Sequence, residues 1–406
     1  MGFEIHSPAC YHGVMSHDDS DAASEPIGRA SPGRPSPFRS ATVDRIRASG
    51  SVWELRGGRI LLPRVFGFCR GVNRALVMVE EAVAREHRRA GRLFLLGQII
   101  HNPWVNRHFE QAGVRILSAD EVAALEEHIG PDDCAIIPAF GVPLPVERRL
   151  AAVGCRTVDT TCTDVRRLWS WAEQASRSGF GVLIFGRAGH DETVVTRSRL
   201  EELGGKYLIV GDLEQAVQFC RIIEGAPSGV DLVEQFGPRA TNTASAEPFT
   251  RLAQVSQTTM LHDETMKLRE MLRESFLRRS GPVGLAERLL FYPTVCRATQ
   301  DRQCAAVELC RGGCDVVIVV GGFGSSNTRH LYELARGFCP TFLIEDAQAI
   351  RSPQELATMD FAKGGPVRVG GWLPSYRPVR VGVLAGASSP EIVIGGVLER
   401  LAEFLS

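Results

Sequence analysis

The stretch "VVIVVGGFGSSNTRH" (Val316–His330) joins an apolar run, a glycine-rich turn and the beginning of a helical pattern. A continuous apolar run is typical of a parallel strand in a sheet that is covered on both faces. Glycines let the backbone approach a ligand closely, and the free amides of a helix N-terminus together with small hydroxyl groups suit an anion. The stretch therefore predicts a strand, a ligand-binding turn and a helix, in that order.

The same alternation of short apolar runs with longer amphipathic segments continues from about Ser51 to the end of the chain. It predicts strands within residues 59–64, 92–97, 134–141, 181–186, 206–211, 252–257, 314–322, 341–346 and 379–386. Helical patterns cover residues 73–90, 164–179, 265–279 and 328–338. Strands that alternate with helices indicate an α/β fold with parallel sheets. Because one doubly wound domain rarely extends over about 350 residues, we expect several smaller units.

A second stretch, "VLAGASSPE" (Val383–Glu391), repeats the order of strand, glycine, serines and helix start. Ligands of such sheets bind at the carboxyl ends of the strands, so two turns of this kind favour an anion site. The alternative is that both are ordinary turns whose Ser and Asn side chains cap the helices. The sequence has no GxxxxGK[ST] loop, and Gly-Gly-Phe-Gly departs from GxGxxG, so a nucleotide site is only weakly indicated.

The composition argues against several classes of partner. With 44% hydrophobic and 23% charged residues and a formal net charge of −1, the chain gives no electrostatic reason to expect binding to nucleic acid or to an anionic membrane. The sequence shows no apolar run near the roughly 20 residues of a membrane helix, and no signal or transit pattern, so we expect a cytoplasmic protein. Residues 1–50 are rich in Ser, Pro, Gly, Ala and Asp and predict a disordered extension, in which Cys10 and the histidines occur by chance.

Three of the 11 cysteines share one setting, at a turn followed by a helix. They are Cys69 in "VFGFCRGVNRA", Cys162 in "VDTTCTDV" and Cys296 in "FYPTVCRATQDRQ". Amides at a helix N-terminus favour a thiolate, and three thiolates from three parts of the chain would suit a metal cluster. Iron–sulfur motifs usually carry local cysteine pairs, however, and most buried cysteines are simply small hydrophobic residues, so spacing alone leaves both interpretations open.

Eight short motifs extend these observations over nearly the whole chain after the extension. In order they are "GFCRGVNRA", "IIHNPWV", "DTTCTDV", "AGHDE", "SQTT", "VCRATQDRQ", "VVGGFGSSNTRHL" and "AGASSPE". In these motifs the chain from about Arg59 to Phe404 resembles the LytB family, 4-hydroxy-3-methylbut-2-enyl diphosphate reductase of the non-mevalonate isoprenoid route. The resemblance implies three small α/β domains with parallel sheets in a pseudo-threefold trefoil around a central [4Fe-4S] cluster, with Cys69, Cys162 and Cys296 as its ligands.

The resemblance also implies an activity, which is the reductive removal of an allylic hydroxyl group from a small diphosphate. Two electrons and two protons enter, water leaves, and isopentenyl and dimethylallyl diphosphates form. The electrons would come from a donor such as ferredoxin or flavodoxin, and the three cysteines would leave one iron open to the substrate.

Residue roles follow motif by motif from the same resemblance. Glu192 matches the proton-donating glutamate, His190 the histidine beside it, and Thr258 a threonine near the substrate hydroxyl. The diphosphate-contacting positions are His101, Ser325, Ser326, Asn327 and Ser388, in agreement with the two anion-binding turns. The implied division of the chain is a disordered extension at 1–55, α/β domains at 56–158, 159–257 and 258–376, and a C-terminal strand and helix at 377–406 that close the core.

The chain departs from the family pattern around the diphosphate. Phe140 stands at the position of a diphosphate-contacting histidine, Trp169 replaces another histidine, and Thr163 replaces a proline. Arg187 and Arg70 stand where histidine and alanine are common. Two alternatives therefore remain beside the family reaction: a LytB-like paralogue that performs a cluster-mediated reduction of a different small substrate, and a non-catalytic cluster-binding redox sensor.

Overall fold

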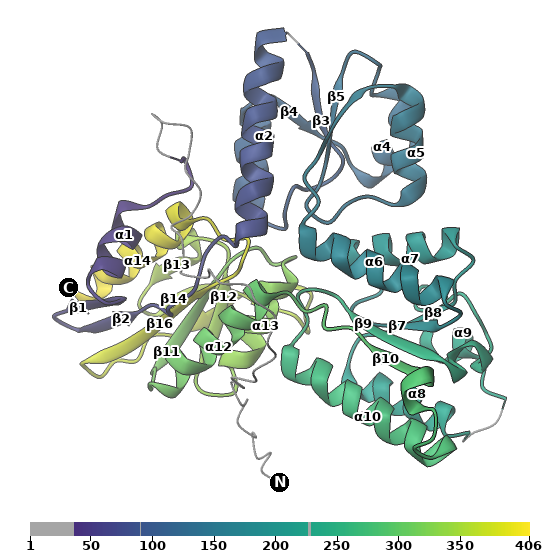
Figure 1. The fold of residues 1–406 in the computed structure, drawn as a ribbon. Coiled ribbons are helices and arrows are strands. Elements are labelled where there is room, and N and C mark those ends of the chain that lie inside the picture. Colours follow the sequence, from purple (N-terminus) through teal and green to yellow (C-terminus); the bar gives the residue numbers. More distant parts are fainter. Residues whose placement is uncertain (1–35, 90, 226–228) are drawn as a thin grey trace, which may run out of the picture.

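A computed structural model of the chain describes residues 36–89, 91–225 and 229–406 and shows three α/β lobes around a common centre (Figure 1). This trefoil arrangement and the α/β class agree with the prediction from the sequence. The segment that decides the fold is strand β11 (Val316–Val320), whose five residues are all fully buried in the middle of a sheet. Burial on both faces is the reason that its sequence is apolar without alternation.

The first lobe contains a parallel four-stranded sheet in the order β4-β3-β5-β6. Its apolar core joins one face of the long helix α2 to β3 and β5. The strands are β3 (Leu93–Leu95), β4 (Val114–Ile116), β5 (Cys134–Ile137) and β6 (Arg156–Asp159), and the helices are α2 (Arg70–Arg89), α3 (Pro103–Gln111), α4 (Ala119–Ala123) and α5 (Leu144–Val153).

The second lobe repeats this plan with a parallel sheet in the order β10-β9-β7-β8. Helix α6 packs on one side of it, and α8 and α10 pack on the other. The strands are β7 (Gly181–Phe185), β8 (Tyr207–Val210), β9 (Leu252–Ser256) and β10 (Leu289–Phe291), and the helices are α6 (Thr163–Arg177), α7 (Asp191–Glu202), α8 (Leu213–Ile223), α9 (Leu232–Phe236), α10 (His262–Ser280) and α11 (Leu285–Arg288).

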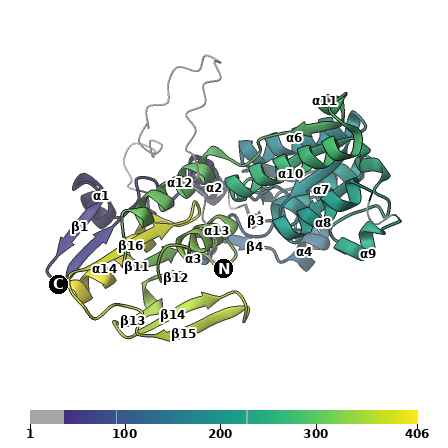
Figure 2. The same ribbon diagram turned by 90° about the horizontal axis from the view of Figure 1, so that it is seen from below.

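The third lobe combines both ends of the described chain in the sheet β1-β2-β16-β11-β12, which is parallel except for the β1–β2 hairpin. A separate antiparallel sheet of β13, β14 and β15 lies at its edge (Figure 2). The remaining elements are β1 (Val52–Leu55), β2 (Gly58–Leu61), β12 (Thr341–Ile344), β13 (Ile350–Ser352), β14 (Glu355–Asp360), β15 (Gly365–Gly370), β16 (Val379–Ala385), α1 (Ala41–Ala48), α12 (Arg297–Arg311), α13 (Ser326–Ala335) and α14 (Glu391–Leu405).

Every strand and helix expected from the sequence is present. The elements that the pattern did not indicate include short strands, such as β6 with the sequence "RTVD" and β10 with only three residues, and several helices, such as α5, α7 and α8. The antiparallel sheet was also not expected, because its strand β15 alternates half-buried and exposed residues and contains Gly and Pro. Among the described residues, no helix combines the length and the apolar character that crossing a bilayer requires.

The prediction of disorder up to residue 55 is wrong for residues 36–55. Helix α1 begins after Ser40, whose side chain accepts a hydrogen bond from the amide of Val43, and Val43 and Ile46 are buried against α14. Arg47 also forms an ion pair with Glu391 at 2.6 Å. Eight helical residues with two apolar positions give almost no periodic signal, so this contact with a distant helix could not be read from the sequence. Residues 1–35, with Cys10, lie outside the described part.

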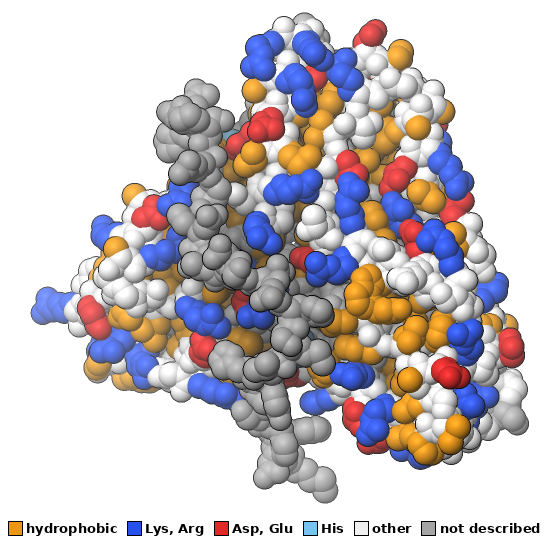
Figure 3. Space-filling view, viewed as in Figure 1, with side chains coloured by type: hydrophobic (Ala, Val, Ile, Leu, Met, Phe, Trp, Pro, Cys, Tyr) orange, Lys and Arg blue, Asp and Glu red, His pale blue; other side chains and the backbone are white. Residues whose placement is uncertain are grey.

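The sheets add two facts to the division of the chain into domains. Strand β2 pairs with β16, so the residues just before Cys69 belong to the same sheet as the C-terminal strand. Strand β10 pairs with β9, so the second sheet extends past residue 258. The boundaries themselves stay a prediction. Figure 3 shows Lys and Arg side chains over all three lobes, interspersed with acidic and apolar ones, on the face viewed there.

Candidate active site where the lobes meet

The structure brings together the three cysteines that the sequence singled out. Cys69 directly precedes α2, and Cys162 and Cys296 are the N-cap residues of α6 and α12, so each cysteine comes from a different lobe. A Cβ atom on Gly71 would lie 2.8 Å from Sγ of Cys162 and 3.8 Å from Sγ of Cys69. Glycine is therefore required where the two thiols approach each other.

Backbone hydrogen bonds connect each cysteine to a turn that carries or adjoins a predicted site residue. In all three cases the cysteine and the turn belong to different lobes. Because the amide of the cysteine is the donor, the position of each thiol is coupled to the position of that turn. The bonds run from Cys69 N to Ala387 O (3.2 Å), from Cys162 N to Ala139 O (3.0 Å) and from Cys296 N to Thr258 O (3.0 Å).

The thiols fit a metal cluster better than a single ion. Burial raises the pKa of Cys162 and raises that of Cys296 to about 12, so both are uncharged thiols unless a metal replaces the proton. In the described ranges, no group of three His, Cys, Asp or Glu side chains lies close enough to hold one metal ion. An iron–sulfur cluster is several atoms wide, so its ligands stand farther apart, and thiolates are the ligands that it prefers.

Glu192 is a buried carboxyl group beside the cysteine site. It occupies the first turn of α7 and is 1% exposed. The amide of Thr258 donates to Oε1 at 2.5 Å, and the hydroxyl of Thr258 donates to Oε2 at 2.7 Å. Burial raises the pKa of Glu192 to about 7, although the two bonds from Thr258 act in the opposite direction. A carboxyl group with such a pKa can hold and release a proton near neutrality.

Two histidines and Phe140 form an aromatic group next to Glu192. His190 is the N-cap of α7, and its Nδ1 accepts a hydrogen bond from the amide of Glu192 at 3.3 Å. Burial, followed by the charge of His101, lowers the pKa of His190 to about 3, so this imidazole is neutral. The ring of Phe140 stacks on His101 with centroids 4.4 Å apart, and its edge faces His190 at 5.8 Å.

His101 is fixed by polar contacts as well. Its Nε2 lies 2.9 Å from Oδ2 of Asp191, and this bond lowers the pKa of the Asp191 carboxyl group. The glycine-rich turn after β11 passes directly against His101, because a Cβ on Gly322 would lie only 2.3 Å from the His101 carbonyl oxygen. The glycine therefore allows the turn and the histidine to form one wall of the site.

The two serine-rich turns lie side by side because β11 and β16 are parallel neighbours. Their hydroxyl groups are linked, since Ser388 Oγ donates to Ser325 Oγ at 3.2 Å. Asn327 Oδ1 accepts from the amide of Ala387 at 2.9 Å. Ser325, Ser326, Asn327 and Ser388 are all buried. Helix α13 begins at this point, so its N-terminal amides add to a set of donors that suits an anion.

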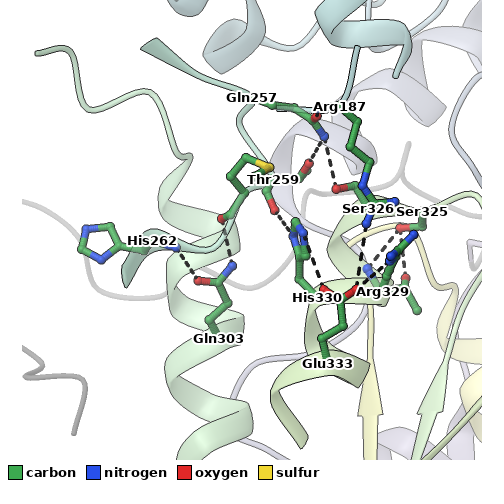
Figure 4. A network of polar contacts seen from close by, with 12 residues as sticks. Arg187, Gln257, Thr259, His262, Gln303, Ser325, Ser326, Arg329, His330 and Glu333 are labelled. Carbon is green, nitrogen blue, oxygen red and sulfur yellow. Dashed lines mark hydrogen bonds and ion pairs between the residues drawn. The ribbon is translucent and has the colours of Figure 1, made fainter. Parts of the chain in front are cut away.

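Gln257 connects the serine turns to the proton-holding carboxyl group. Its Nε2 donates to Ser326 Oγ at 3.2 Å and to Thr259 Oγ1 at 2.7 Å (Figure 4). The next residue is Thr258, which binds Glu192. The motif "SQTT" predicts a role for Thr258 alone, and its glutamine is the sequence signal that points to this second contact.

Arg187 lies on the same side as the serine turns. Its backbone amide donates to Gln257 Oε1 at 3.2 Å, and its Nη2 lies 3.9 Å from Glu333 Oε1 (Figure 4). Glu333 has a closer cation, because Nε of Arg329 lies 2.7 Å from the same oxygen. Burial and then the charge of Arg329 lower the pKa of Arg187. The Arg187 guanidinium is thus a cation whose nearest carboxylate is already bound to another arginine.

Trp169 and Arg70, two of the positions that depart from the family pattern, have different surroundings. Trp169 is buried, and the guanidinium of Arg199 lies 4.0 Å from the centroid of its ring. A Cβ on Gly141 would lie 2.3 Å from the Trp169 ring, so the indole packs against the residue after Phe140. Arg70 is exposed at the first position of α2.

Together, the fold and the site define a class: three-lobed α/β enzymes that act where the lobes meet, with one cysteine from each lobe beside a buried acid and a hydroxyl-rich anion site. The family model "LytB protein" matches residues 60–402. The chain belongs to the LytB family.

Named relatives and solved structures agree with this membership. The chain is 36% identical over 375 residues to 4-hydroxy-3-methylbut-2-enyl diphosphate reductase of Gloeobacter violaceus, with 90% of this chain and 88% of the relative covered. It is 34% identical to the reductase of a Synechococcus strain, with 90% and 89% covered. A solved reductase described as the terminal enzyme of the non-mevalonate pathway gives a TM-score of 0.50 at 25% identity, with 85% and 99% covered.

A solved reductase of Plasmodium falciparum shares the fold. Its TM-score is 0.61 at 19% identity, and the similarity covers 84% of this chain and 86% of that chain. The trefoil fold of the family and the three lobes of this chain therefore correspond.

Proposed function

We propose that this protein is a 4-hydroxy-3-methylbut-2-enyl diphosphate reductase. The reaction takes up two electrons and two protons, releases the allylic hydroxyl group as water and leaves isopentenyl or dimethylallyl diphosphate. The observation that carries the proposal is the chain of contacts Glu192–Thr258–Cys296. The buried carboxyl group of Glu192 accepts a hydrogen bond from the Thr258 hydroxyl, and the Thr258 carbonyl oxygen accepts a hydrogen bond from the amide of Cys296, a candidate cluster ligand. This arrangement sets a proton donor beside a redox site.

We assign Cys69, Cys162 and Cys296 as ligands of a [4Fe-4S] cluster. When bound, such a cluster supplies electrons one at a time and an iron, not ligated by the protein, that acts as a Lewis acid. The other residues of the site act on the substrate. Ser325, Ser326, Asn327, Ser388 and His101 bind the diphosphate through their polar groups. Phe140 and the neutral ring of His190 exclude water from the allylic part.

Glu192 holds the proton that the departing hydroxyl group needs. Thr258 orients this carboxyl group through two hydrogen bonds. The Thr258 hydroxyl, which lies beside the carboxyl group, also contacts the substrate oxygen in this proposal. The electron donor is a small carrier such as ferredoxin or flavodoxin, and the protein works in the cytoplasm. Binding of nucleic acid or of a membrane is not part of this proposal.

The experiment that tests the function is turnover after anaerobic purification. The protein is mixed with 4-hydroxy-3-methylbut-2-enyl diphosphate and a chemical reductant, and the two product diphosphates are quantified. We expect both products to form. An iron-loaded protein that binds the substrate and yields neither product would contradict the assignment. It would favour the paralogue that reduces a different small substrate, because Phe140 replaces a polar group of the family pattern.

Arg187 gives a prediction about the diphosphate. Since Arg329 already neutralises Glu333, we propose that the Arg187 guanidinium contacts the diphosphate and offsets the histidine that Phe140 replaces. Arg187→Met should weaken substrate affinity roughly ten-fold, because a hydrogen bond to a charged group contributes about 1.5–3 kcal/mol. Titration of the iron-loaded protein with substrate measures this, and iron content should not change.

The matched control is Arg197→Met, on the outer part of α7, where the guanidinium binds the carbonyl oxygen of Arg239 at 2.8 Å. This variant should bind substrate like the wild type. Equal affinity of the Arg187 and Arg197 variants would show that the diphosphate is bound without Arg187.

A further inference from the structure

We propose that Arg302 is the counter-charge of the cysteine site, and that its buried guanidinium raises the reduction potential of the bound cluster by stabilising negative charge at Cys69 and Cys296. This role rests on the proposed cofactor, but it is independent of the substrate. In this assignment Arg302 is a positioning and tuning residue, because it acts through the cysteines and does not contact the substrate.

The first observation is a buried cation without a carboxylate. Arg302 lies on α12 and is only 5% exposed. Within the described part of the chain its guanidinium binds carbonyl oxygens and no carboxylate, and Asp301, the acidic residue that acts on its charge, is paired with Arg297 at 2.9 Å. A buried charge without a partner is strongly unfavourable, so the site must provide negative charge in another form.

The second observation is how the guanidinium is bound. Nη1 donates to the carbonyl of Ala298 at 2.8 Å, within α12, and Nη2 donates to the carbonyl of Gly67 at 2.7 Å. Nε is buried and has no hydrogen-bond partner among the residues that the structure describes. The side chain is therefore fixed by two carbonyl oxygens, and the buried Nε–H donor stays available to a group that the protein does not supply.

The third observation is the position of these contacts. Gly67 stands two residues before Cys69, and α12 begins directly after Cys296, so Arg302 joins the segments that carry two of the three thiols. Burial lowers the pKa of Arg302. Negative charge at Cys69 and Cys296 would raise it, and the effect of each is larger than the effect of Asp301. The guanidinium is thus bound between the segments that carry two of the thiolates that a cluster would require.

A fixed positive charge in a water-poor site favours the more negative state of a redox group. Addition of an electron makes a cysteine-ligated cluster more negative, so the reduced form gains more from Arg302 than the oxidised form does. Hydrogen bonds to the sulfur atoms and burial are known determinants of cluster potentials. We therefore expect removal of the charge to make the cluster harder to reduce.

The experiment is a spectroscopic redox titration of the anaerobically purified, iron-loaded protein without substrate. Arg302→Met keeps much of the side-chain volume and removes the charge. The equilibrium constant for one-electron reduction should fall at least ten-fold, which corresponds to about 59 mV to lower potential. Arg302→Lys keeps the charge and should restore most of the wild-type potential, and Arg302→Gln should behave like Arg302→Met.

The matched control is Arg297→Gln. Arg297 directly follows Cys296, but its side chain is 86% exposed and is paired with Asp301 at 2.9 Å. Water screens its charge, so this variant should titrate like the wild type. A merely structural arginine would change iron retention or stability in the lysine variant as well as in the neutral ones, and would leave the midpoint potential of the loaded fraction where it was.

Each remaining outcome decides the proposal. If the neutral variants lose iron while Arg302→Lys retains it, the charge is needed and the proposal stands. Neutral variants that hold a cluster at the wild-type potential overturn the proposal. Loss of iron from all three variants, including Arg302→Lys, overturns it as well. A wild-type protein without iron overturns the proposed cofactor and this role with it, which distinguishes that failure from a failure of Arg302 alone.

Discussion

We expect Cys162→Ser to purify with little or no iron, and the wild type to carry close to four irons per chain. Serine replaces a soft thiolate by a hydroxyl group that stays protonated and binds iron–sulfur clusters poorly. Because three of the cysteines that the structure describes converge at the N-termini of α2, α6 and α12, the loss of one leaves two of these ligands. The measurement is iron and sulfide content after anaerobic purification, together with the visible absorption of the cluster. Cys69→Ser and Cys296→Ser should behave in the same way.

The controls are cysteines that lie in the cores of two lobes. Cys134 is buried in β5, and Cys220 is buried in α8. Their replacement by serine should cost some stability, because it buries a hydroxyl group in an apolar region, and it should leave the iron content unchanged. Full iron retention in Cys162→Ser would contradict the ligand assignment.

Glu192→Gln should lower turnover by roughly 100-fold or more, while the iron content should stay at the wild-type level. Glutamine has nearly the same shape. Its amide oxygen can accept the bond from the Thr258 amide and its NH2 group can donate to the Thr258 hydroxyl, but it cannot give a proton to the departing hydroxyl group. The measurement is the steady-state rate with the family diphosphate and a chemical reductant, alongside the spectral change on substrate binding, which should persist.

The raised pKa of Glu192 also gives the sign of the pH dependence. With a pKa of about 7, the carboxyl group carries its proton below neutrality and loses it above. Wild-type turnover should therefore fall as the pH rises through about 7. The residual activity of Glu192→Gln should not show this decline with pH. A suitable control is Glu202→Gln at the far end of the same helix, where the carboxylate pairs with Arg148 at 2.7 Å. A Glu192 variant as active as this control would assign the acid role to another group.

Much of the fold could be predicted from the sequence because its central strands are buried on both faces. Val316–Val320 and Gly181–Phe185 are continuous apolar runs that leave little choice of structure. Elements stabilised by distant partners could not be predicted in this way. Helix α1 is held by α14, and β15 pairs only with β14. Neither carries a strong periodic pattern of its own.

The same distinction between local patterns and distant contacts holds for the candidate site. The resemblance gave the residue types and the turns, and the structure places all of the named residues around one centre, although their roles stay a prediction. What the sequence could not give are contacts between lobes. The family pattern indicates a lost diphosphate contact at Phe140, whereas the structure shows its ring stacked on the ring of His101. Gln257 and Arg302 act through atoms that lie 69 and 235 positions away along the chain, and no local pattern reports such pairs.

The position of β16 has a consequence for the order of events during synthesis. This strand lies between β2 and β11 in the third sheet, although β2 leaves the ribosome more than 300 residues before β16. The lobes that carry Cys69 and Cys162 can therefore fold while translation continues, but the lobe that begins near Cys296 waits until β16 has been made. We expect cofactor loading to be a post-translational step, and chains that stop before Val379 to remain without iron.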